Sequence, residues 1–285
     1  MPFVDSALAF ELGDSLFAAA IEAVRNARGR AVLVGLCGSQ ASGKSTTAGR
    51  LAERLGRQGA RTIVFSIDDF YLNLRERREL AGSVHPLLAT RGVPGTHDMI
   101  LMAGTIDALL RARPDSITSL PRFDKASDDR VPRDEWPDFE GRPDVVILEG
   151  WCVGARPQAE SALLEPVNAL EAREDADGRW RRYANACLAG DYAAFFARLD
   201  LRLMLRAPSF ECVHGWRAEQ EAGLNRDSQS ARPAMSDAEL ARFIAHYERM
   251  TRWILEDEPA DLIADIDERR APFAWRIGKP LLAGR

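Results

Sequence analysis

Short apolar runs alternate with amphipathic stretches along most of this chain. Ala31–Leu36 and Thr62–Ile67 are apolar runs bounded by polar residues, which is the pattern of strands buried in a parallel sheet. The same pattern predicts three further strands, at Asp144–Leu148, Leu201–Leu205 and Asp261–Ile266. Strands that alternate with helices indicate an α/β fold in which helices cover both faces of a parallel sheet.

Between these runs, hydrophobic residues recur at helical spacing. A helix is predicted over Leu8–Ala27, and another over Ser45–Gly56, directly after the first strand. Further helices are predicted at Ile100–Ala112, Arg179–Leu199, Phe210–Ala222 and Asp237–Leu255. Aromatic residues at helical spacing near the middle of the second half are interpreted as core: Trp180, Tyr183, Tyr192, Phe195 and Phe196.

Two polar stretches interrupt this alternation, at about residues 72–98 and 121–143. The first is rich in arginine, and the second contains four prolines and many charges. Both are too long for simple connections, and they adjoin strands whose ends should line a site, so we interpret them as substrate loops. The alternative is a pair of solvated surface loops. The prediction is one domain over residues 1–285, with a helical N-terminal segment at 1–30.

Composition and charge restrict the partners. The net charge of −5 and the isoelectric point near 5.6 argue against a general nucleic-acid-binding role. No run approaches transmembrane length and no signal-peptide pattern is present, so we expect no membrane association and a cytoplasmic location. The four cysteines lack metal-site or redox-motif spacing, and we expect them to be reduced. The sequence leaves the oligomeric state open.

A glycine-rich segment follows the first predicted strand and fits the pattern G-x-x-x-x-G-K-[ST]. Its glycines let the backbone curl so that successive N–H groups point at phosphate oxygens, and the following helix adds its positive dipole end. We expect Lys44 to reach the β- and γ-phosphates of a nucleoside triphosphate and the Ser45 hydroxyl to bind Mg²⁺. The residues expected at the nucleotide are Gly38, Ser39, Gln40, Ala41, Ser42, Gly43, Lys44, Ser45 and Thr46.

Carboxylates stand at the ends of two other strands. Asp68 and Asp69 follow the second strand, where a carboxylate could accept a proton from an attacking hydroxyl or hold a metal-bound water. Adjacent side chains point to different sides, so one of the two faces the phosphate, and the other is explained as a helix cap. Glu149 ends the strand Val145–Leu148 and is placed to contact Mg²⁺ directly or through water.

These motifs together resemble a known group of enzymes. The P-loop, the S-x-D-x-F-Y segment from Ser66 and the strand ending in Glu149-Gly150 are similar to phosphoribulokinase, uridine kinase and pantothenate kinase. The segment Arg91–Asp98 (RGVPGTHD) resembles the R-G-x-x-G-T-H-D segment of the plant and fungal D-glycerate 3-kinase family. Further similarity lies in LPRFDK from Leu120, in the stretch from Glu165 and in APSFECVHGWRAEQE from Ala207. The resemblance runs from about the P-loop to the C-terminus.

The resemblance implies a P-loop kinase that uses ATP and Mg²⁺ to convert D-glycerate into 3-phosphoglycerate. By position in the motifs, Asp68 matches the aspartate that acts as the base, and Glu149 matches a second carboxylate near magnesium. Arg217 matches an arginine of a lid, for which Arg206–Glu221 is the candidate segment. The predicted catalytic residues are Asp68, Lys44 and Arg217, and the predicted metal ligands are Ser45, Asp68 and Glu149.

A small hydroxy acid needs cations for its carboxylate and polar groups for its hydroxyls. The two loops supply these in Arg91, His97, Arg122 and Lys125, although each is also explained as a surface charge or, for His97, as a backbone contact. The predicted substrate residues are Arg91, Gly95, Thr96, His97, Asp98, Arg122, Asp124 and Lys125.

Two other functions remain open at this point. One is a kinase for a nucleoside or a pantothenate-like alcohol, whose pocket would require aromatic stacking groups. The other is a nucleotide-hydrolysing switch or binding protein, which would turn over ATP without an added acceptor. The S-x-D-x-F-Y segment favours an alcohol acceptor, and no N-K-x-D segment for guanine recognition is present.

Overall fold

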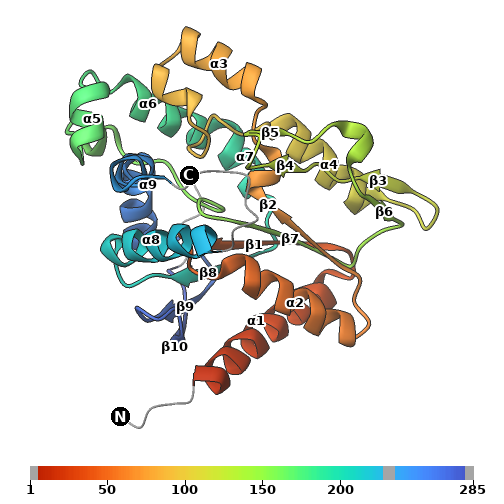
Figure 1. Cartoon of the computed structure of the whole chain (residues 1–285). Helices are drawn as coiled ribbons and strands as arrows, with labels where there is room; N and C mark the ends of the chain where they lie inside the picture. The colour runs from red at the N-terminus through yellow and green to blue at the C-terminus, as the bar shows by residue number, and fades with distance from the viewer. Residues whose placement is uncertain (1–5, 227–234, 280–285) are drawn as a thin grey trace.

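The computed structural model describes residues 6–226 and 235–279. Within them, the centre is a six-stranded sheet in the order β10-β9-β8-β1-β7-β2 (Figure 1). Its strands are β1 (Val32–Gly38), β2 (Thr62–Ser66), β7 (Val145–Gly150), β8 (Leu201–Arg206), β9 (Leu262–Ile266) and β10 (Pro272–Ile277). The first five strands pair with one another in parallel, and β10 pairs antiparallel with β9 at one edge. The predicted α/β fold is confirmed with all five predicted strands, and β10 is an addition.

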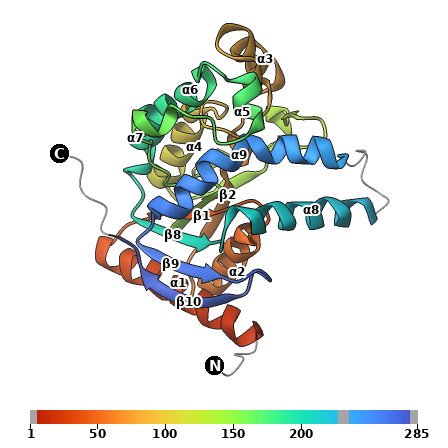
Figure 2. The same ribbon diagram turned by 90° about the vertical axis from the view of Figure 1, so that its left-hand side faces the viewer.

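Alternation of side chains along β1 explains why helices cover both faces. Val32, Val34 and Leu36 point to one face, where they pack with helices α1 and α2. Leu33 and Cys37 point to the other face, where they pack with residues of α4, α7 and α9. These helices are α1 (Ser6–Arg28), α2 (Lys44–Arg57), α4 (Met99–Arg111), α7 (Ala193–Phe196) and α9 (Asp237–Asp257). In Figure 2, α7 and α9 lie above β8 and β9 in the view, and α1 lies beside β10 below them.

The first predicted substrate loop is largely helical, which corrects the prediction. It contains α3 (Leu74–Ser83) and a 3₁₀ turn at Pro86–Ala89. Asn73 accepts a hydrogen bond from the backbone N–H of Glu76, and the Glu76 carboxylate accepts one from the N–H of Asn73. This capping box starts α3 in spite of the many arginines that follow.

The second predicted substrate loop has little regular structure. It holds one short hairpin, formed by β4 (Phe123–Asp124) and β5 (Asp129–Arg130). Near its end, β6 (Asp138–Glu140) pairs antiparallel with β3 (Ile117–Ser119), which precedes the loop. The fully buried Arg77 joins this loop to the first one. Its guanidinium donates to the carbonyl oxygens of Leu72, Ala89 and Asp128, at 3.1, 3.0 and 2.5 Å.

The predicted helix Arg179–Leu199 is interrupted. It consists of α6 (Arg179–Cys187), a π-helical turn at Leu188–Tyr192 and α7, because Gly190 has non-helical dihedral angles. The aromatic residues assigned to the core are buried there, except that Tyr183 is only partly buried. A short helix, α5 (Ala169–Glu174), precedes this region, and α8 (Phe210–Arg226) and α9 form two adjacent arms beside the sheet.

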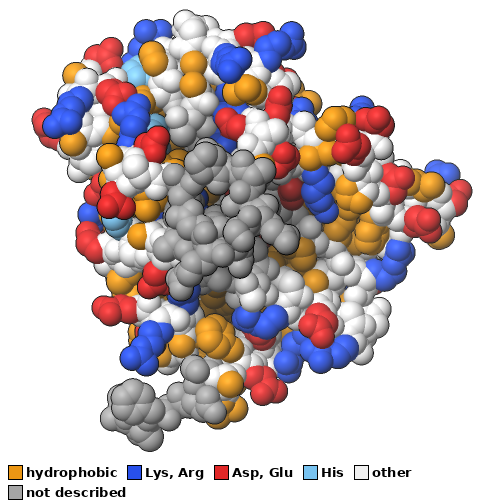
Figure 3. Space-filling model, viewed as in Figure 1, with side chains coloured by type: hydrophobic (Ala, Val, Ile, Leu, Met, Phe, Trp, Pro, Cys, Tyr) orange, Lys and Arg blue, Asp and Glu red, His pale blue; other side chains and the backbone are white. Residues whose placement is uncertain are grey.

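All four cysteines are free thiols, as predicted. Among the helices described in residues 6–226 and 235–279, none is both long and apolar enough to cross a bilayer. On the face shown in Figure 3, acidic and basic side chains are interspersed.

Candidate active site

The loop between β1 and α2 has the backbone that the P-loop pattern predicts. Ala41 and Gly43 have φ angles of 57° and 88°, in the left-handed region, which turns the chain tightly before the first residue of α2. A Cβ atom on Gly38 would lie 2.7 Å from Ser42 Oγ, so a larger residue there would displace the Ser42 side chain from its present position.

Several buried polar atoms of this loop have no protein partner. Ser39 Oγ, Ser42 Oγ and both amide atoms of the Gln40 side chain lack a hydrogen bond to any part of the chain that the structure describes. Buried polar groups are normally paired. Together with the N-terminus of α2, these atoms form a cradle suited to the phosphates of a nucleotide.

Ser45 and Glu149 meet at the ends of neighbouring strands. Parallel pairing of β1 with β7 places Glu149 opposite Leu36, and Ser45 Oγ donates a 2.7 Å hydrogen bond to Glu149 Oε1. Glu149 is 4% exposed, and its Oε2 lies 3.9 Å from Lys44 Nζ. A hydroxyl and a buried carboxylate are oxygen ligands of the kind that Mg²⁺ prefers, so this pair fits a magnesium ion.

The two adjacent aspartates have different surroundings. Asp69 accepts a 3.0 Å hydrogen bond from the N–H of Ser66 and thereby caps the 3₁₀ turn Ile67–Phe70. Burial raises the pKa of Asp69 to about 6, in spite of the nearby Arg122. Asp68 instead lines the large cavity described below. This geometry favours Asp68 over Asp69 as the group that faces an acceptor.

Asp68 is held by two side chains. Tyr71 Oη donates to Asp68 Oδ1 at 2.7 Å, and Lys125 Nζ donates to Asp68 Oδ2 at 2.6 Å. Burial alone would raise the pKa of Asp68, but the charges of Lys125 and Lys44 outweigh it and lower the pKa to about 2. Asp68 is therefore ionised at neutral pH.

A cavity of about 1090 Å³ lies between the P-loop, the two substrate loops and the arms α8 and α9. Five predicted catalytic or substrate residues line it together: Lys44, Asp68, Arg91, Lys125 and Arg217. Arg217 of α8 lies over the ring of Phe243 at 5.4 Å, and this contact joins α8 to α9 above the P-loop. Arg217 also donates a hydrogen bond to Gln220, within α8, at 2.5 Å. Arg91 is ion-paired with Asp128 and is 14% exposed.

The rest of the Arg91–Asp98 segment forms the frame of the site. Thr96 Oγ1 accepts from the N–H of Gly92 and donates to the carbonyl of Val93. Asp98 caps α4 through the N–H of Leu101. These side chains do not line the cavity, and a role for Thr96 and Asp98 in substrate binding stays a prediction.

Gly95 and His97 share one partner. The hydroxyl of Tyr192 accepts from the N–H of Gly95 at 3.0 Å and lies 2.7 Å from His97 Nδ1. The imidazole stacks on Tyr71, with the ring centroids 4.6 Å apart, and burial lowers its pKa to about 4. A neutral His97 thus supports Tyr71, which in turn contacts Asp68.

Arg122 and Asp124 also lie outside the cavity lining. Arg122 Nη1 is 3.4 Å from Asp69 Oδ2. The exposed Asp124 accepts hydrogen bonds from the N–H groups of Ala126 and Ser127, which fixes the tip of the β4–β5 hairpin. Their assignment as substrate ligands stays a prediction.

Several residues of the cavity were not predicted. Trp151, Tyr247 and Asp128 line it, and so does Arg270, whose Nε donates to the carbonyl of Ala41 in the P-loop at 2.9 Å. Tyr71 stood in the S-x-D-x-F-Y motif and could have been singled out there. Arg270 carries no local signal, because it reaches the P-loop only through the turn between β9 and β10.

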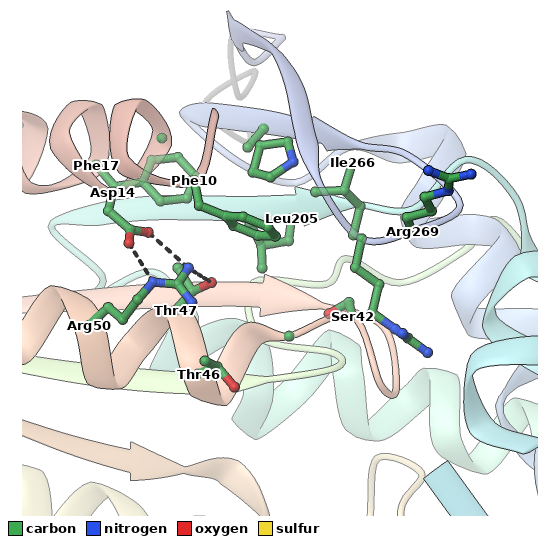
Figure 4. A pocket seen from close by; sticks show the side chains of 15 residues that line it. Phe10, Asp14, Phe17, Ser42, Thr46, Thr47, Arg50, Leu205, Ile266 and Arg269 are labelled. Atoms are coloured by element: carbon green, nitrogen blue, oxygen red, sulfur yellow. Dashed lines mark hydrogen bonds and ion pairs between the residues drawn. The ribbon is translucent and has the colours of Figure 1, made fainter. Parts of the chain in front are cut away.

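A smaller cavity of about 210 Å³ lies between α1, the start of α2 and strands β8 and β9 (Figure 4). Phe10 and Phe17 of α1 and Leu205 and Ile266 of the sheet supply apolar walls. Asp14 Oδ2 accepts a 2.5 Å hydrogen bond from Arg50 Nε at one side. Three residues line both cavities and therefore mark their junction at the P-loop: Gly43, Thr46 and Arg270.

Comparison with known proteins agrees with this geometry. Residues 13–70, which contain the P-loop and Asp68, match the family described as methylmalonyl Co-A mutase-associated GTPase MeaB. The chain is 29% identical over 266 residues to the chloroplastic D-glycerate 3-kinase of Arabidopsis thaliana. That match covers 85% of the chain and only 54% of the plant protein, so the chain spans about half of its length.

A further relative covers most of both proteins. The chain is 32% identical over 231 residues to the uncharacterized kinase mug58 of Schizosaccharomyces pombe, a match that covers 77% of the chain and 79% of the yeast protein. The chain belongs to the D-glycerate 3-kinase family of P-loop kinases. Membership makes it a nucleotide-dependent kinase for a small molecule.

The fold of this D-glycerate 3-kinase family member also matches a solved structure. It superposes on D-glycerate 3-kinase from Cryptococcus neoformans with a TM-score of 0.75, covering 93% of this chain and 98% of the other. The identity in that comparison is 23%, so it bears on the architecture alone.

Proposed function

We propose that this kinase transfers the γ-phosphate of ATP to a hydroxyl of a small hydroxy acid, and that D-glycerate, converted into 3-phosphoglycerate, is its acceptor. The observation that carries the proposal is the placement of Asp68 beside Lys125 in a cavity that also contains Arg91 and the P-loop lysine. This arrangement puts a base for a hydroxyl, and cations for a carboxylate, opposite the phosphate site.

Each residue has a separate task in this mechanism. Asp68 accepts the proton of the attacking hydroxyl as the bond to phosphorus forms. Lys44 and Arg217 neutralise the charge that spreads over the transferring group. Ser45 and Glu149 would hold Mg²⁺, which supplies further neutralisation of the phosphates. Phe243 and Tyr247 of α9 cover the cavity and help to exclude water, the competing acceptor.

The two cavities give the nucleotide and the acceptor separate places. The phosphates lie at their junction, beside Gly43, Thr46 and Arg270. The acceptor occupies the larger cavity, where Asp68 lies. The nucleobase of ATP extends into the smaller cavity. Phe10 and Ile266 offer apolar surface there, and the volume suits one ring system.

The test is ADP release by the purified chain with Mg-ATP, with and without D-glycerate. A panel of other hydroxy acids, nucleosides and pantothenate is measured beside it. Stimulation by D-glycerate, with 3-phosphoglycerate as the product, is the expected result. Steady hydrolysis that no acceptor stimulates would contradict the proposal and favour a nucleotide-hydrolysing switch.

A second candidate is a kinase for a nucleoside or a pantothenate-like alcohol. The observation in its favour is that aromatic side chains line the cavity, namely Tyr71, Trp151, Phe243 and Tyr247. Tyr71 and Tyr247 use their hydroxyls inside the protein, on Asp68 and on the carbonyl of Arg91. The same panel distinguishes this candidate, because an uncharged alcohol would then stimulate ADP release more than any acid.

A further inference from the structure

In the large cavity, the proposed general base Asp68 is in direct contact with Lys125 of the second substrate loop. Lys125 Nζ lies 2.6 Å from Asp68 Oδ2, while the other carboxylate oxygen takes the hydrogen bond from Tyr71. Both Asp68 and Lys125 line the cavity. An acceptor hydroxyl that donates to Asp68 Oδ2 must therefore lie beside the ammonium group, so Lys125 contacts whatever chemical group stands next to that hydroxyl.

Lys125 is able to change partners, whereas Asp68 is fixed. The Lys125 side chain is 60% exposed and extends from the tip of the β4–β5 hairpin. Lysine has a long, flexible stem, so its ammonium group can turn to a new partner without a change in the backbone. Asp68 sits on the 3₁₀ turn Ile67–Phe70, whose N-terminal end is fixed by a reciprocal capping box between Ser66 and Asp69. The side chain of Lys125 can move while the base stays in place.

Arg91, the second cation that the two substrate loops supply to the cavity, is held more firmly than Lys125. Arg91 is 14% exposed, is ion-paired with Asp128 and lies over the ring of Phe123 at 5.5 Å. The hairpin tip itself is fixed by the hydrogen bonds of Asp124 with the two residues that follow Lys125. Of these two loop cations, Lys125 is therefore the one whose side chain can rearrange at the acceptor site.

We propose that Lys125 selects acids over uncharged alcohols by exchanging Asp68 for the carboxylate of the acceptor. Without an acceptor, the ammonium group of Lys125 donates its hydrogen bond to Asp68 Oδ2. A carboxylate a few bonds from the reacting hydroxyl draws the ammonium group to itself and leaves Asp68 Oδ2 to the hydroxyl. An uncharged alcohol offers no such partner and must compete with Lys125 for the base. This inference rests on the proposed function and narrows its substrate class to 2- and 3-hydroxy acids.

The experiment compares an acid with its neutral counterpart. The acceptors are D-glycerate and D-glyceramide, with saturating Mg-ATP, and the variants are Lys125→Met, Lys125→Arg and the control Lys279→Met. Lys279 is equally exposed and lies beyond β10, 3.9 Å from Glu258. Loss of a charge-assisted contact lowers kcat/KM for D-glycerate by about 10- to 100-fold in Lys125→Met, mainly through KM.

For D-glyceramide, kcat/KM in Lys125→Met stays equal or rises, because the base is no longer occupied. Lys125→Arg keeps the charge and retains most of the preference for the acid, and Lys279→Met behaves as the wild type. An equal fall for both acceptors in Lys125→Met overturns the inference, because it indicates a structural role in the hairpin. An undiminished preference for the acid overturns it as well.

The failure of the proposed function has a different signature. If the wild type phosphorylates an uncharged alcohol better than any acid, or if calorimetry shows no binding of D-glycerate with Mg-ADP present, both proposals are wrong. If the wild type phosphorylates D-glycerate while Lys125→Met keeps the full preference, only the assignment of Lys125 is wrong.

Discussion

Ser45 Oγ and Glu149 Oε1 are 2.7 Å apart, although 104 residues separate them in the sequence. The contact depends on the parallel pairing of β1 with β7, which brings the end of one strand beside the P-loop that follows the other. The sheet itself therefore brings together Ser45 and Glu149, the two residues proposed to bind magnesium.

Glu149→Gln should raise the Mg²⁺ concentration needed for half-maximal activity by about 10-fold or more, since the amide keeps the shape and removes the charge. Mg²⁺ titrations of ADP release at fixed ATP measure this change. Glu140→Gln, at an exposed position on β6, is the matched control and should leave the titration unchanged. An unaltered Mg²⁺ requirement in Glu149→Gln would remove this residue from the metal site.

Asp68→Asn should keep nucleotide binding and lower phosphoryl transfer by at least about 100-fold, the usual scale for the loss of a general base. Calorimetry with Mg-ADP and steady-state rates separate the two effects. Asp134→Asn changes an exposed carboxylate outside the cavity lining and should behave as the wild type. Near-normal transfer in Asp68→Asn would show that another group accepts the proton.

His97 should make the free energy of unfolding depend on pH. Its pKa in the folded chain is about 4, against 6.5 for an ordinary histidine, so its contribution is complete above pH 6.5 and is lost as the pH falls towards 4. At pH 5 the loss amounts to about 2 kcal/mol. Asp69, whose raised pKa of about 6 acts in the opposite direction over part of this range, partly masks the effect.

His97→Gln isolates the histidine, because glutamine can still contact Tyr192 and does not titrate. Urea unfolding of both proteins at pH 7.5, 6.0 and 5.0 is the measurement. The stability difference between wild type and variant should shrink by about 2 kcal/mol from pH 7.5 to pH 5.0. A difference that is constant with pH would mean that His97 titrates normally in the folded chain.

Gly92→Ala should destabilise the chain by at least about 2 kcal/mol. Gly92 has a φ of 133°, and an added Cβ would lie 2.1 Å from the hydroxyl oxygen of Tyr247. Gly82→Ala is the control, because that glycine lies within α3 with open space around it, and alanine there should be neutral or stabilising by up to about 1 kcal/mol. Equal melting temperatures for the two variants would contradict the packing of Gly92 against α9.

Local patterns predicted most of the sheet. The apolar runs of β1 and β7 are continuous because both faces are buried, and such runs are recognisable without any tertiary information. Strand β10 was missed because it lies at the edge, where Phe273 and Ile277 remain exposed and the hydrophobic signal is weak. Gly190, which interrupts a helical pattern, was the one available sign of the π-helical turn.

The parts of the site that come from one contiguous segment were predictable, whereas contacts between distant segments were not. The P-loop with Ser45 depends on a short contiguous segment, so its pattern is readable. The hydrogen bond from Ser45 to Glu149 and the approach of Arg270 to Ala41 depend on strand order, which the sequence pattern does not specify. The helix-capping role of Asp98 could not be predicted for a different reason, since the sequence alone does not distinguish an aspartate that caps a helix from one that binds a substrate.

Arg77 has a consequence for how new acceptor specificities can arise in this architecture. Because one buried guanidinium holds carbonyl groups from both substrate loops, the conformations of the two loops depend on each other. Exchange of residues 72–98 alone with those of a relative would separate Arg77 and Arg91 from Asp128, their common partner in the second loop. A chimaera that changes its substrate and still folds should therefore carry residues 72–143 as one block.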